Sequence, residues 1–486
     1  MNRHAFRMGQ LYLFLAWCGL TDGAQGDPVA AWPQFRGPNA QGVAPGGRFP
    51  DLLGPDNRVW SVEVPEGFSS PVVWGDRIFL TGVVGERAVM VCVSSADGAE
   101  LWRAEVPGDL AGNVHRTSSP VAATPATDGE RVVGYFPGFG LVAWNMEGKE
   151  SWRRPLDVPF VVNGSGTSPA LVDGTLVLCV DSQGGGSYVM ALDPATGQTR
   201  WRTPRPAAVS NYTTPVVWKR GGTAEVIISG NLRASGYALS DGAERWNVGG
   251  LEAVSVSPTP VLGDGAAYFM SRSLGGGAGV PPGFESLLLA ADANKDGKLT
   301  LEEAVPLQSD GAFTFVDGDR DGWVTKEELA TAAEYLRRAD YGLFALRDPS
   351  GEAGKVSAGD LSDTHVLWRH RKGVAKVTTP LLLDGRLIVV QDGGMVTATE
   401  AATGRIVFER ERLGAEGGGD YFASPISDGR RVCFASLRGT ITLAKVGESL
   451  HILHQTTLEG PLAATPALVG GRLYVRSGKQ LIAFGK

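Results

Sequence analysis

Cysteine is scarce in this chain, which has only four Cys among 486 residues. Cys18 lies in the N-terminal segment, and Cys92, Cys179 and Cys433 each lie within a separate apolar run. Three widely spaced cysteines in the remainder are no disulfide framework. We therefore expect them to be buried thiols that pack as small hydrophobic residues.

Patterns typical of catalysis and of nucleic-acid binding are also missing. His365 and His370 are five residues apart on one expected strand, so they face opposite sides and cannot share a metal. No Ser-His-Asp arrangement, phosphate-binding glycine loop or zinc-ligand spacing occurs. The net charge is −7 without any Lys/Arg cluster, which excludes a basic surface for nucleic acid. The sequence predicts no catalytic residues.

Long apolar runs are absent apart from Leu11–Leu20, which is too short to span a bilayer. This run follows basic residues within the first seven positions and precedes the small-residue sequence AQG at 24–26. Residues 1–26 therefore predict a secretory signal and export to the periplasm or the extracellular space. Cys18 raises the alternative of a lipoprotein, but Trp17 before it is bulkier than a lipidation site normally accepts.

What the chain has in abundance is glycine, 67 residues, concentrated in turns between short apolar runs. The segment 167–201 (TSPALVDGTLVLCVDSQGGGSYVMALDPATGQTRW) holds three such runs, separated by Asp-Gly, Gly-Gly-Gly and Thr-Gly, and a fourth around Trp201. Runs this short between turn signals predict four antiparallel strands. One such sheet cannot bury both of its faces, so it needs neighbours.

Copies of this unit recur along the chain. A proline opens the first strand at Pro71, Pro125, Pro169, Pro215, Pro260, Pro380, Pro425 and Pro466. An aromatic residue closes the fourth strand at Trp60, Trp102, Trp152, Trp201, Trp246, Trp368 and Phe408. In five copies a glycine lies four residues before it, at Gly98, Gly148, Gly197, Gly242 and Gly404, where a tight turn requires positive φ.

The two ends of the chain complement each other. After Pro466 only three strands fit before the C-terminus, whereas 58–64 (RVWSVEV) is a fourth strand without a blade. Pairing them would close a ring and remove exposed sheet edges. The sequence therefore predicts an all-β, eight-bladed propeller of four-stranded antiparallel blades, closed by the N-terminal strand, and we expect a monomer.

The spacing of the copies also divides the chain. Residues 27–57, rich in Pro and Gly, are an irregular leader, in which Trp32 and Phe35 are expected in an inter-blade groove. Residues 58–274 and 342–486 form the propeller. The step from Pro260 to Pro380 is 120 residues against 41 to 54 elsewhere, which places a small α-helical insertion at 275–341 in blade 5.

The insertion contains two calcium-loop motifs. Residues 292–303 (DANKDGKLTLEE) and 317–328 (DGDRDGWVTKEE) both match D-x-[DN]-x-[DN]-G-x5-E. This spacing wraps oxygen atoms around one point, as a hard cation requires. The predicted ligands are Asp292, Asn294, Asp296, the carbonyl of Lys298, Thr300 and Glu303, then Asp317, Asp319, Asp321, the carbonyl of Trp323, Thr325 and Glu328. Leu299 and Val324 are expected to pair between the loops.

The flanks and the charge of the insertion agree with this EF-hand pair. FESLLLA at 284–290 and KEELATAAEYLRR at 326–338 predict the entering and leaving helices. Residues 285–338 carry twelve Asp and Glu against six Lys and Arg. We predict two Ca²⁺ sites of low affinity, of order 10⁻⁴ to 10⁻³ M as in extracellular modules. These properties favour a structural clasp; a lid over the propeller remains open.

Two stretches resemble a known family. Ala191-x-Asp193-x-x-Thr196-Gly197-x-x-x-Trp201 resembles the tryptophan-docking repeat of pyrroloquinoline-quinone-type (PQQ-like) propellers, and Ala398 to Phe408 is a looser copy. The leader WPQFRGPNAQGVA is similar to the start of exported bacterial PQQ-like repeat proteins. The resemblance covers almost all of 32–486 outside the insertion. It implies that the Trp rings wedge between neighbouring blades.

Two functions follow from this resemblance. BamB-like propellers are binding platforms, and we predict such a binding or scaffold role, with a protein or carbohydrate ligand. The alternative is a PQQ-dependent dehydrogenase of alcohols or sugars. In that branch the resemblance implies PQQ over the channel with a calcium held by Glu, Asn and Asp, and usually adjacent cysteines, which are absent here.

A ligand is expected at the channel mouth, on the face that carries the loops from the fourth strand of one blade to the first of the next. Loops on a rigid scaffold commonly carry recognition residues. The candidate rim comprises the polar residues Asn113, His115, Arg116, Asn163, Ser165, Asn211, Tyr212, Lys376, Asp420 and Tyr421. Taken singly, each such residue is more often an ordinary solvated or loop-capping residue.

Overall fold

The protein is described from a computed structural model. It describes residues 31–44, 46–110, 114, 118–159, 161, 163–182, 186–205, 211–253, 256–263, 265–273, 283–304, 316–317, 321–337, 339–350 and 357–485. The predicted signal segment 1–26 lies outside the described residues. Within them, no helix is both long and apolar enough to cross a membrane.

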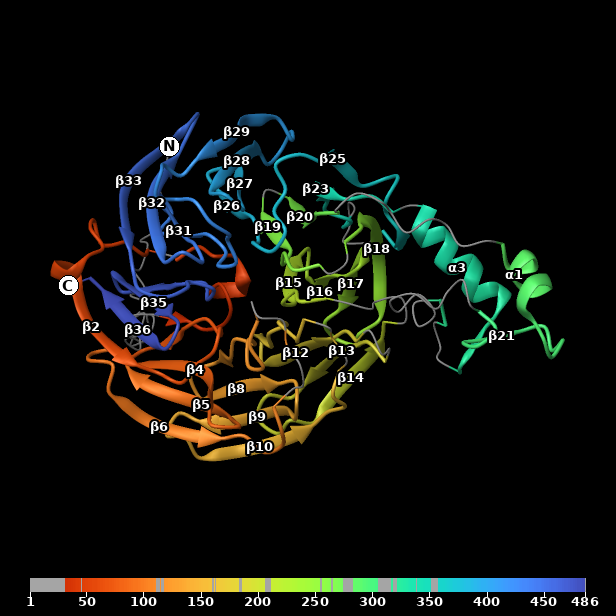
Figure 1. Cartoon of the computed structure of the whole chain (residues 1–486), viewed down its shortest axis with the longest axis horizontal. Helices are drawn as coiled ribbons and strands as arrows, with labels where there is room; N and C mark the ends of the chain where they lie inside the picture. The colour runs from red at the N-terminus through yellow and green to blue at the C-terminus, as the bar shows by residue number, and fades with distance from the viewer. Residues whose placement is uncertain are drawn as a thin grey trace, which may run out of the picture.

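Eight antiparallel sheets stand around a central channel, each with its first strand innermost (Figure 1). The first four blades comprise β3 (Val72–Trp74), β4 (Arg77–Val84), β5 (Arg87–Ser94) and β6 (Glu100–Glu105); β7 (Ala126–Thr127), β8 (Arg131–Phe136), β9 (Gly140–Asn145) and β10 (Glu150–Pro155); β11 (Ala170–Val172), β12 (Thr175–Val180), β13 (Tyr188–Leu192) and β14 (Thr199–Pro204); β15 (Val216–Arg220), β16 (Thr223–Ser229), β17 (Leu232–Ala238) and β18 (Glu244–Leu251).

The other four blades follow the same order, with the insertion inside blade 5. They comprise β19 (Val261–Gly263), β20 (Ala266–Ser271), β23 (Gly342–Arg347) and β25 (Val366–His370); β26 (Leu381–Leu383), β27 (Arg386–Gln391), β28 (Met395–Glu400) and β29 (Ile406–Arg412); β30 (Ile426–Ser427), β31 (Val432–Ala435), β32 (Thr440–Val446) and β33 (Leu450–Thr457); β34 (Ala467–Val469), β35 (Arg472–Ser477), β36 (Gln480–Phe484) and β2 (Arg58–Glu63).

The N-terminal strand closes the ring. β2 pairs antiparallel with β36, from Arg58 opposite Phe484 to Glu63 opposite Gln480. The last blade is therefore built from both ends of the chain. The predicted eight-bladed propeller is confirmed.

Stacking of the sheets explains the apolar runs. All six residues of β12 are buried, because the middle strands of a blade have a neighbouring sheet on each face. The outermost strands alternate between less and more exposed residues, as β10 does. An entirely apolar middle strand and an alternating outer strand are what a ring of packed sheets requires.

The tryptophan that closes one blade docks on the next blade, as the resemblance implies. Trp152 of blade 2 donates its indole N–H to the carbonyl of Pro194 in blade 3 at 2.8 Å, and Trp201 does the same to Leu239 in blade 4 at 2.9 Å. The turn glycine lies directly under the ring: a Cβ built on Gly197 would be 2.6 Å from Trp152. These glycines thus serve the contact between blades as well as the turn.

Trp246 of blade 4 departs from this pattern. Its indole donates to Glu225 of its own blade at 2.9 Å, and the ring is fully buried. Blade 5 lacks the turn glycine, because Thr364 stands four residues before Trp368, and β23 and β25 are joined by a longer connection. Within it, β24 (Gly359–Asp360) runs parallel to β18 with Gly359 opposite Trp246. The long connection thus places β24 beside Trp246.

A belt of hydroxyl groups links the blades around the channel. Every repeat proline is preceded by Ser or Thr. The backbone N–H of one such residue donates to the hydroxyl of the next blade's residue in seven of the eight steps, at 3.0 to 3.2 Å: Ser70 to Thr124, Thr124 to Ser168, Thr214 to Thr259, Thr259 to Thr379, Thr379 to Ser424, Ser424 to Thr465, and Thr465 to Ser70. No such bond between Ser168 and Thr214 is found in the described structure.

Removing one hydroxyl from this belt should weaken the propeller. We expect Thr379→Val to lower the free energy of unfolding by about 1–3 kcal/mol, because the buried N–H of Thr259 loses its acceptor. Thr214→Val is the matched control, since the N–H of Ser168 does not donate to its hydroxyl. Chemical denaturation of both variants tests this. If both variants lost the same free energy of unfolding, the hydrogen bonds of the belt would not stabilise the ring.

The leader crosses the floor of the channel and contacts the innermost strands in turn. β1 (Ala31–Trp32) pairs with β3, with Trp32 opposite Val73. The side chain of Asn39, in the short helix η1 (Pro38–Ala40), accepts the N–H of Val217 at 2.9 Å and donates to its carbonyl at 2.8 Å. Hydrogen bonds join the leader to the other blades, between Pro33 and Thr127, Gln34 and Leu171, Gln41 and Leu262, Arg36 and Pro380, and from both Gly42 and Ala44 to Ser427.

In most of these contacts the residue on the blade lies two positions after the repeat proline. At this position the inner edge of each sheet exposes its backbone N–H and C=O groups. Sheet edges with unpaired N–H and C=O groups require such a cover. Phe35 lines the channel, whereas Trp32 is fully buried in the apolar core that blades 8 and 1 share. After η2 (Pro55–Asn57) the chain enters β2.

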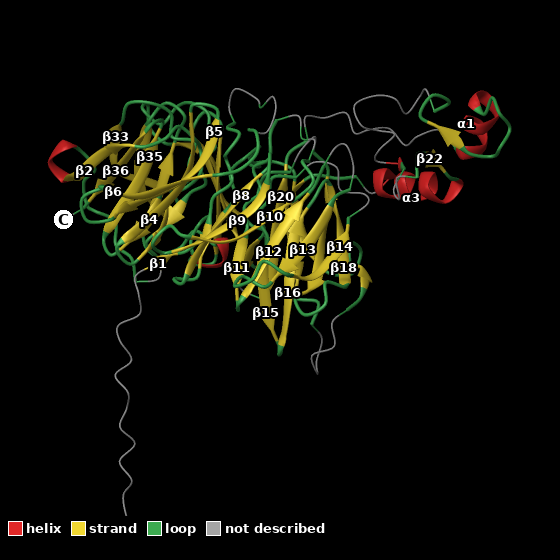
Figure 2. Ribbon diagram, turned by 90° about the horizontal axis from the view of Figure 1, so that it is seen from below, coloured by secondary structure: helices red, strands yellow, loops and turns green. Residues whose placement is uncertain are grey.

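The insertion forms a separate small core. It contains α1 (Phe284–Ala291), the paired strands β21 (Leu299–Thr300) and β22 (Trp323–Val324), and α3 (Lys326–Arg337). Leu287, Leu299, Val324 and Leu329 are buried in a cluster made only of residues of this module. Figures 1 and 2 show the module outside the ring, beside β18.

Candidate functional sites

The first calcium loop is described in full, and the backbone holds its carboxylates. Asp292, at the end of α1, accepts the N–H of Gly297 on Oδ2 at 3.1 Å. Asp296 accepts the N–H of Lys298 at 2.9 Å. Gly297 has φ +80°, which the sharp turn at this position needs.

Glu303 closes the first loop. Its Oε2 accepts the N–H of Thr300 at 3.0 Å and the hydroxyl of Thr300 at 2.9 Å. These two hydrogen bonds lower the pKa of the Glu303 carboxyl, which is therefore ionised at neutral pH. A charged carboxylate at the twelfth position is what a calcium loop requires.

The second loop repeats this arrangement where it is described. Asp317 accepts the N–H of Gly322 at 3.2 Å, Asp321 that of Trp323 at 2.9 Å, and Glu328 that of Thr325 at 2.9 Å. Asp319 lies outside the described residues. Leu299 pairs with Val324 as predicted, so the two loops lie back to back.

The donor set of the loops suits calcium. Oδ1 of Asp292 is buried and accepts no hydrogen bond from the described residues, although a buried carboxylate oxygen needs a partner. The predicted donors are all oxygens: carboxylates, one amide, backbone carbonyls and hydroxyls, the set that Ca²⁺ prefers. In this structure the carboxylates of the loops accept hydrogen bonds from backbone N–H groups. Within the described part of the chain, no three His, Cys, Asp or Glu residues lie close enough together to hold a metal ion.

The second candidate site is the channel pocket, with a volume of about 430 Å³. Six hydroxyl groups of the belt line it: Ser70, Thr124, Ser168, Thr379, Ser424 and Thr465. Phe35 of the leader, Phe68, Tyr212 and Phe422 add aromatic rings. Arg272 and Lys376 are its charged residues, and its described lining contains no Asp or Glu.

Comparison with protein families identifies the propeller. The model described as outer membrane protein assembly factor BamB matches residues 116–273 and 342–450, more than half of the chain. The chain belongs to the BamB family. The gap between the two matched ranges holds the insertion, and an EF-hand model matches residues 284–303. No curated protein sequence matches the chain significantly.

Solved structures share the fold of this BamB-family propeller at low identity. BamB from Moraxella catarrhalis is 13% identical with a TM-score of 0.55, over 88% of this chain and 97% of that one. A europium-containing methanol dehydrogenase is 11% identical with a TM-score of 0.55, over 93% and 90%. A quinohemoprotein alcohol dehydrogenase from Pseudomonas putida is 12% identical with a TM-score of 0.53, over 94% and 80%. At these identities the likeness is one of fold alone.

The predicted rim residues of this BamB-family chain lie in different places. Asn163, Tyr212 and Lys376 line the channel pocket. Ser165 and Asn211 are buried, and the Asn211 side chain accepts the N–H of Thr213 at 2.8 Å, a loop-capping role.

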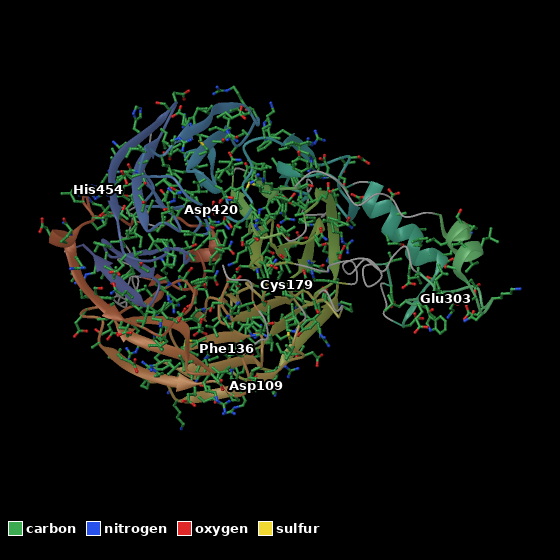
Figure 3. All side chains as sticks on the ribbon, viewed as in Figure 1. Asp109, Phe136, Cys179, Glu303, Asp420 and His454 are labelled. Carbon is green, nitrogen blue, oxygen red and sulfur yellow. The ribbon has the colours of Figure 1, made fainter. Side chains whose placement is uncertain are left out.

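The remaining rim residues either do not line the pocket or lie outside the described residues. Tyr421 is buried and donates its hydroxyl to Gly417 at 2.7 Å. Asp420, which is labelled in Figure 3, is exposed and does not line the pocket. Asn113, His115 and Arg116 lie outside the described residues.

Sequence reasoning missed Arg272 and the hydroxyl belt. The belt had a visible signal, the Ser or Thr before every repeat proline. Arg272 had none: it follows β20 and lines the pocket without any motif around it.

The described cysteines are all buried, in blades 1, 3 and 7. Burial raises the pKa of the Cys92 and Cys433 thiols to about 12 and that of Cys179 as well, so none is a reactive thiolate at neutral pH. They pack as small apolar side chains.

The pocket does not fit the PQQ arrangement that the resemblance implies. That arrangement needs Glu, Asn and Asp around a calcium, and the described lining offers Asn163 but no carboxylate. The cysteines lie in separate blades, so no adjacent pair is available.

Proposed function

We propose that this chain is an exported, calcium-binding propeller that acts as a binding or scaffold protein through the channel mouth. The observation that carries the calcium part is the shared geometry of the two loops, with a buried oxygen of Asp292 to which no described residue donates a hydrogen bond. The binding part is supported by a pocket of ligand size. Protein or carbohydrate ligands suit its mixture of aromatic rings and hydroxyl groups.

Each loop would hold one Ca²⁺ through oxygen atoms alone. In the first loop the ligands would be Asp292, Asn294, Asp296, the Lys298 carbonyl, Thr300 and Glu303; in the second, Asp317, Asp319, Asp321, the Trp323 carbonyl, Thr325 and Glu328. The ion would supply a fixed positive charge that ties the helices α1 and α3 to the β21–β22 pair. The low affinity expected of extracellular modules makes a structural clasp the better account than a switch.

Calcium should stabilise the protein through both loops. At a calcium concentration tenfold above Kd, each site adds about 1.4 kcal/mol to the free energy of unfolding of the module. Glu303→Gln combined with Glu328→Gln should abolish this calcium-dependent shift, which differential scanning calorimetry measures with and without chelator. Glu302→Gln combined with Glu327→Gln is the control, because it removes the same charge one residue away from each ligand. A wild type whose melting ignores calcium would overturn the proposal.

Terbium luminescence separates the two sites. Trp323 is the only tryptophan between residues 284 and 337, and its own carbonyl is a predicted ligand of the second loop. Luminescence excited through tryptophan should therefore disappear in Asp317→Asn and persist in Asp292→Asn.

A binding role rather than a reaction is supported by the hydroxyl groups and aromatic rings of the pocket and by the lack of a carboxylate in its described lining. Reconstitution with PQQ and calcium, followed by a dye-linked assay with alcohols and sugars, should give no turnover. Turnover that depends on added PQQ would replace this proposal with the dehydrogenase function.

A further inference from the structure

We propose that the channel pocket binds a small organic acid, a carboxylate carried on a body about the size of one six-membered ring. This inference rests on the proposed binding function and specifies the ligand of the same pocket. Three properties of the described lining carry it. Two cations have no ion pair with a described carboxylate, several hydroxyl groups have a proton without an acceptor in the described structure, and the leader closes the pocket on one side.

The two cations share one wall of the pocket. The N–H of Ala375 lies 3.5 Å from Sδ of Met270, which joins the end of β20 to the loop before β26. Arg272 lies two residues after Met270, Lys376 directly follows Ala375, and both cations line the pocket. Like charges held on one wall repel each other unless an anion lies near them.

Neither cation has an ion pair with a described carboxylate, in contrast to basic residues nearby. Arg371, in the same loop as Lys376, is paired with Asp340 at 2.8 Å. Arg369 lies 3.5 Å from the same carboxylate. In a chain with a net charge of −7, two exposed cations in a pocket whose described lining has no acid form a local site for negative charge.

The hydroxyl belt adds hydrogen-bond donors. Each belt hydroxyl that lines the pocket already accepts a backbone N–H from the neighbouring blade, as Ser424 does from Thr379 at 3.0 Å. Its own proton has no acceptor within the described structure, so it can be donated into the channel. A pocket with many donors and no carboxylate acceptor favours an anion over a cation.

The remaining lining suits a compact ring. Phe35 closes the floor from the leader, and Phe68, Tyr212 and Phe422 contribute aromatic rings. Aromatic faces pack against the C–H face of a sugar or against another aromatic ring. A volume of about 430 Å³ is near the lower end of ligand pockets. A sugar acid and an aromatic acid share this chemistry, and the test separates them.

The test uses pairs of probes that differ in charge. Calorimetric titration of the whole protein at low ionic strength compares glucuronate with glucose, and benzoate with benzyl alcohol. We expect the acid of at least one pair to bind about tenfold or more tightly than its neutral partner, and the pair that responds identifies the source. Arg272→Gln and Lys376→Gln should each weaken that acid about tenfold and leave the melting temperature unchanged.

Lys372→Gln is the matched control, because Lys372 lies in the loop of Lys376, is exposed and does not line the pocket. It should leave the affinity unchanged. Equal affinity for the acid and neutral members of both pairs, or no binding of either acid, would overturn the proposal. Neutral probes that bind as tightly as the acids would contradict the preference for an acid but not the proposed binding function. Calcium binding by the insertion is tested separately, by the calorimetry and terbium measurements above.

Discussion

Gly197→Ala should destabilise the propeller by about 3 kcal/mol or more, far beyond the usual effect of one methyl group on a surface turn. Gly197 has φ +69°, in which an L-residue is strained by about 1–2 kcal/mol. The larger part of the loss should come from the neighbouring blade. A Cβ at this position would be 2.6 Å from the ring of Trp152, so the tryptophan must leave its place.

The displacement of Trp152 would also break its hydrogen bond to Pro194, which joins blades 2 and 3. Gly174→Ala separates this effect from backbone strain. Gly174 lies in the same blade with φ +63°, and a Cβ there meets nothing within 4 Å. The Gly174→Ala variant should therefore lose only the free energy that the strained backbone conformation costs, about 1 kcal/mol.

Chemical denaturation followed by tryptophan fluorescence measures both variants. The difference between them is the contribution of the contact between turn glycine and docked tryptophan. If both variants lost the same free energy, the glycines would serve only their turns, and the tight approach of the ring would not matter for stability.

The repeat was readable from the sequence because its signals are local. A proline opens all eight copies, and in five of them a turn glycine is followed four positions later by an aromatic residue. The spacing alone counted eight blades and located the insertion. The calcium loops were readable for the same reason, since all ligands of a loop lie within twelve residues. The pairing of β2 with β36 followed from matching two incomplete blades.

The path of the leader was not readable. Arg36 donates to the carbonyl of Pro380 at 2.9 Å across 344 positions of the chain, and no periodic pattern marks residues whose partners are seven different blades. Trp246 matched the docking repeat in sequence, yet β24 pairs beside it, and the next blade lacks the turn glycine. Contacts of this kind depend on which elements become neighbours in space.

Two shortened chains should separate the leader from the closing strand. A chain that begins at residue 58 keeps β2 but lacks the leader, and we expect it to fold with stability reduced by at least about 3 kcal/mol. The reason is the loss of Trp32, which is fully buried in the core between blades 8 and 1. Its far-ultraviolet circular dichroism should remain that of the longer chain that begins at residue 27.

A chain that begins at residue 65 should instead be insoluble, because it lacks β2. Blade 8 then ends at β36 with an unpaired edge, which is a template for pairing with other chains. Trp60 is lost too, whose indole donates to Ser95 of blade 1 at 3.2 Å and whose ring lies 5.9 Å from that of Tyr474. Size-exclusion chromatography of the two shortened chains measures the difference.

The defect should be repaired by supplying the strand as a separate molecule. A peptide of residues 56–66, added during refolding of the chain that begins at residue 65, offers the β2 register from Arg58 to Glu63. A peptide with Val62→Pro is the control, because proline removes a backbone donor from the middle of the strand. Recovery of monomeric protein with the first peptide alone would show that β2 closes the ring. A soluble, equally stable chain without any peptide would mean that the seven complete blades and three strands need no closure.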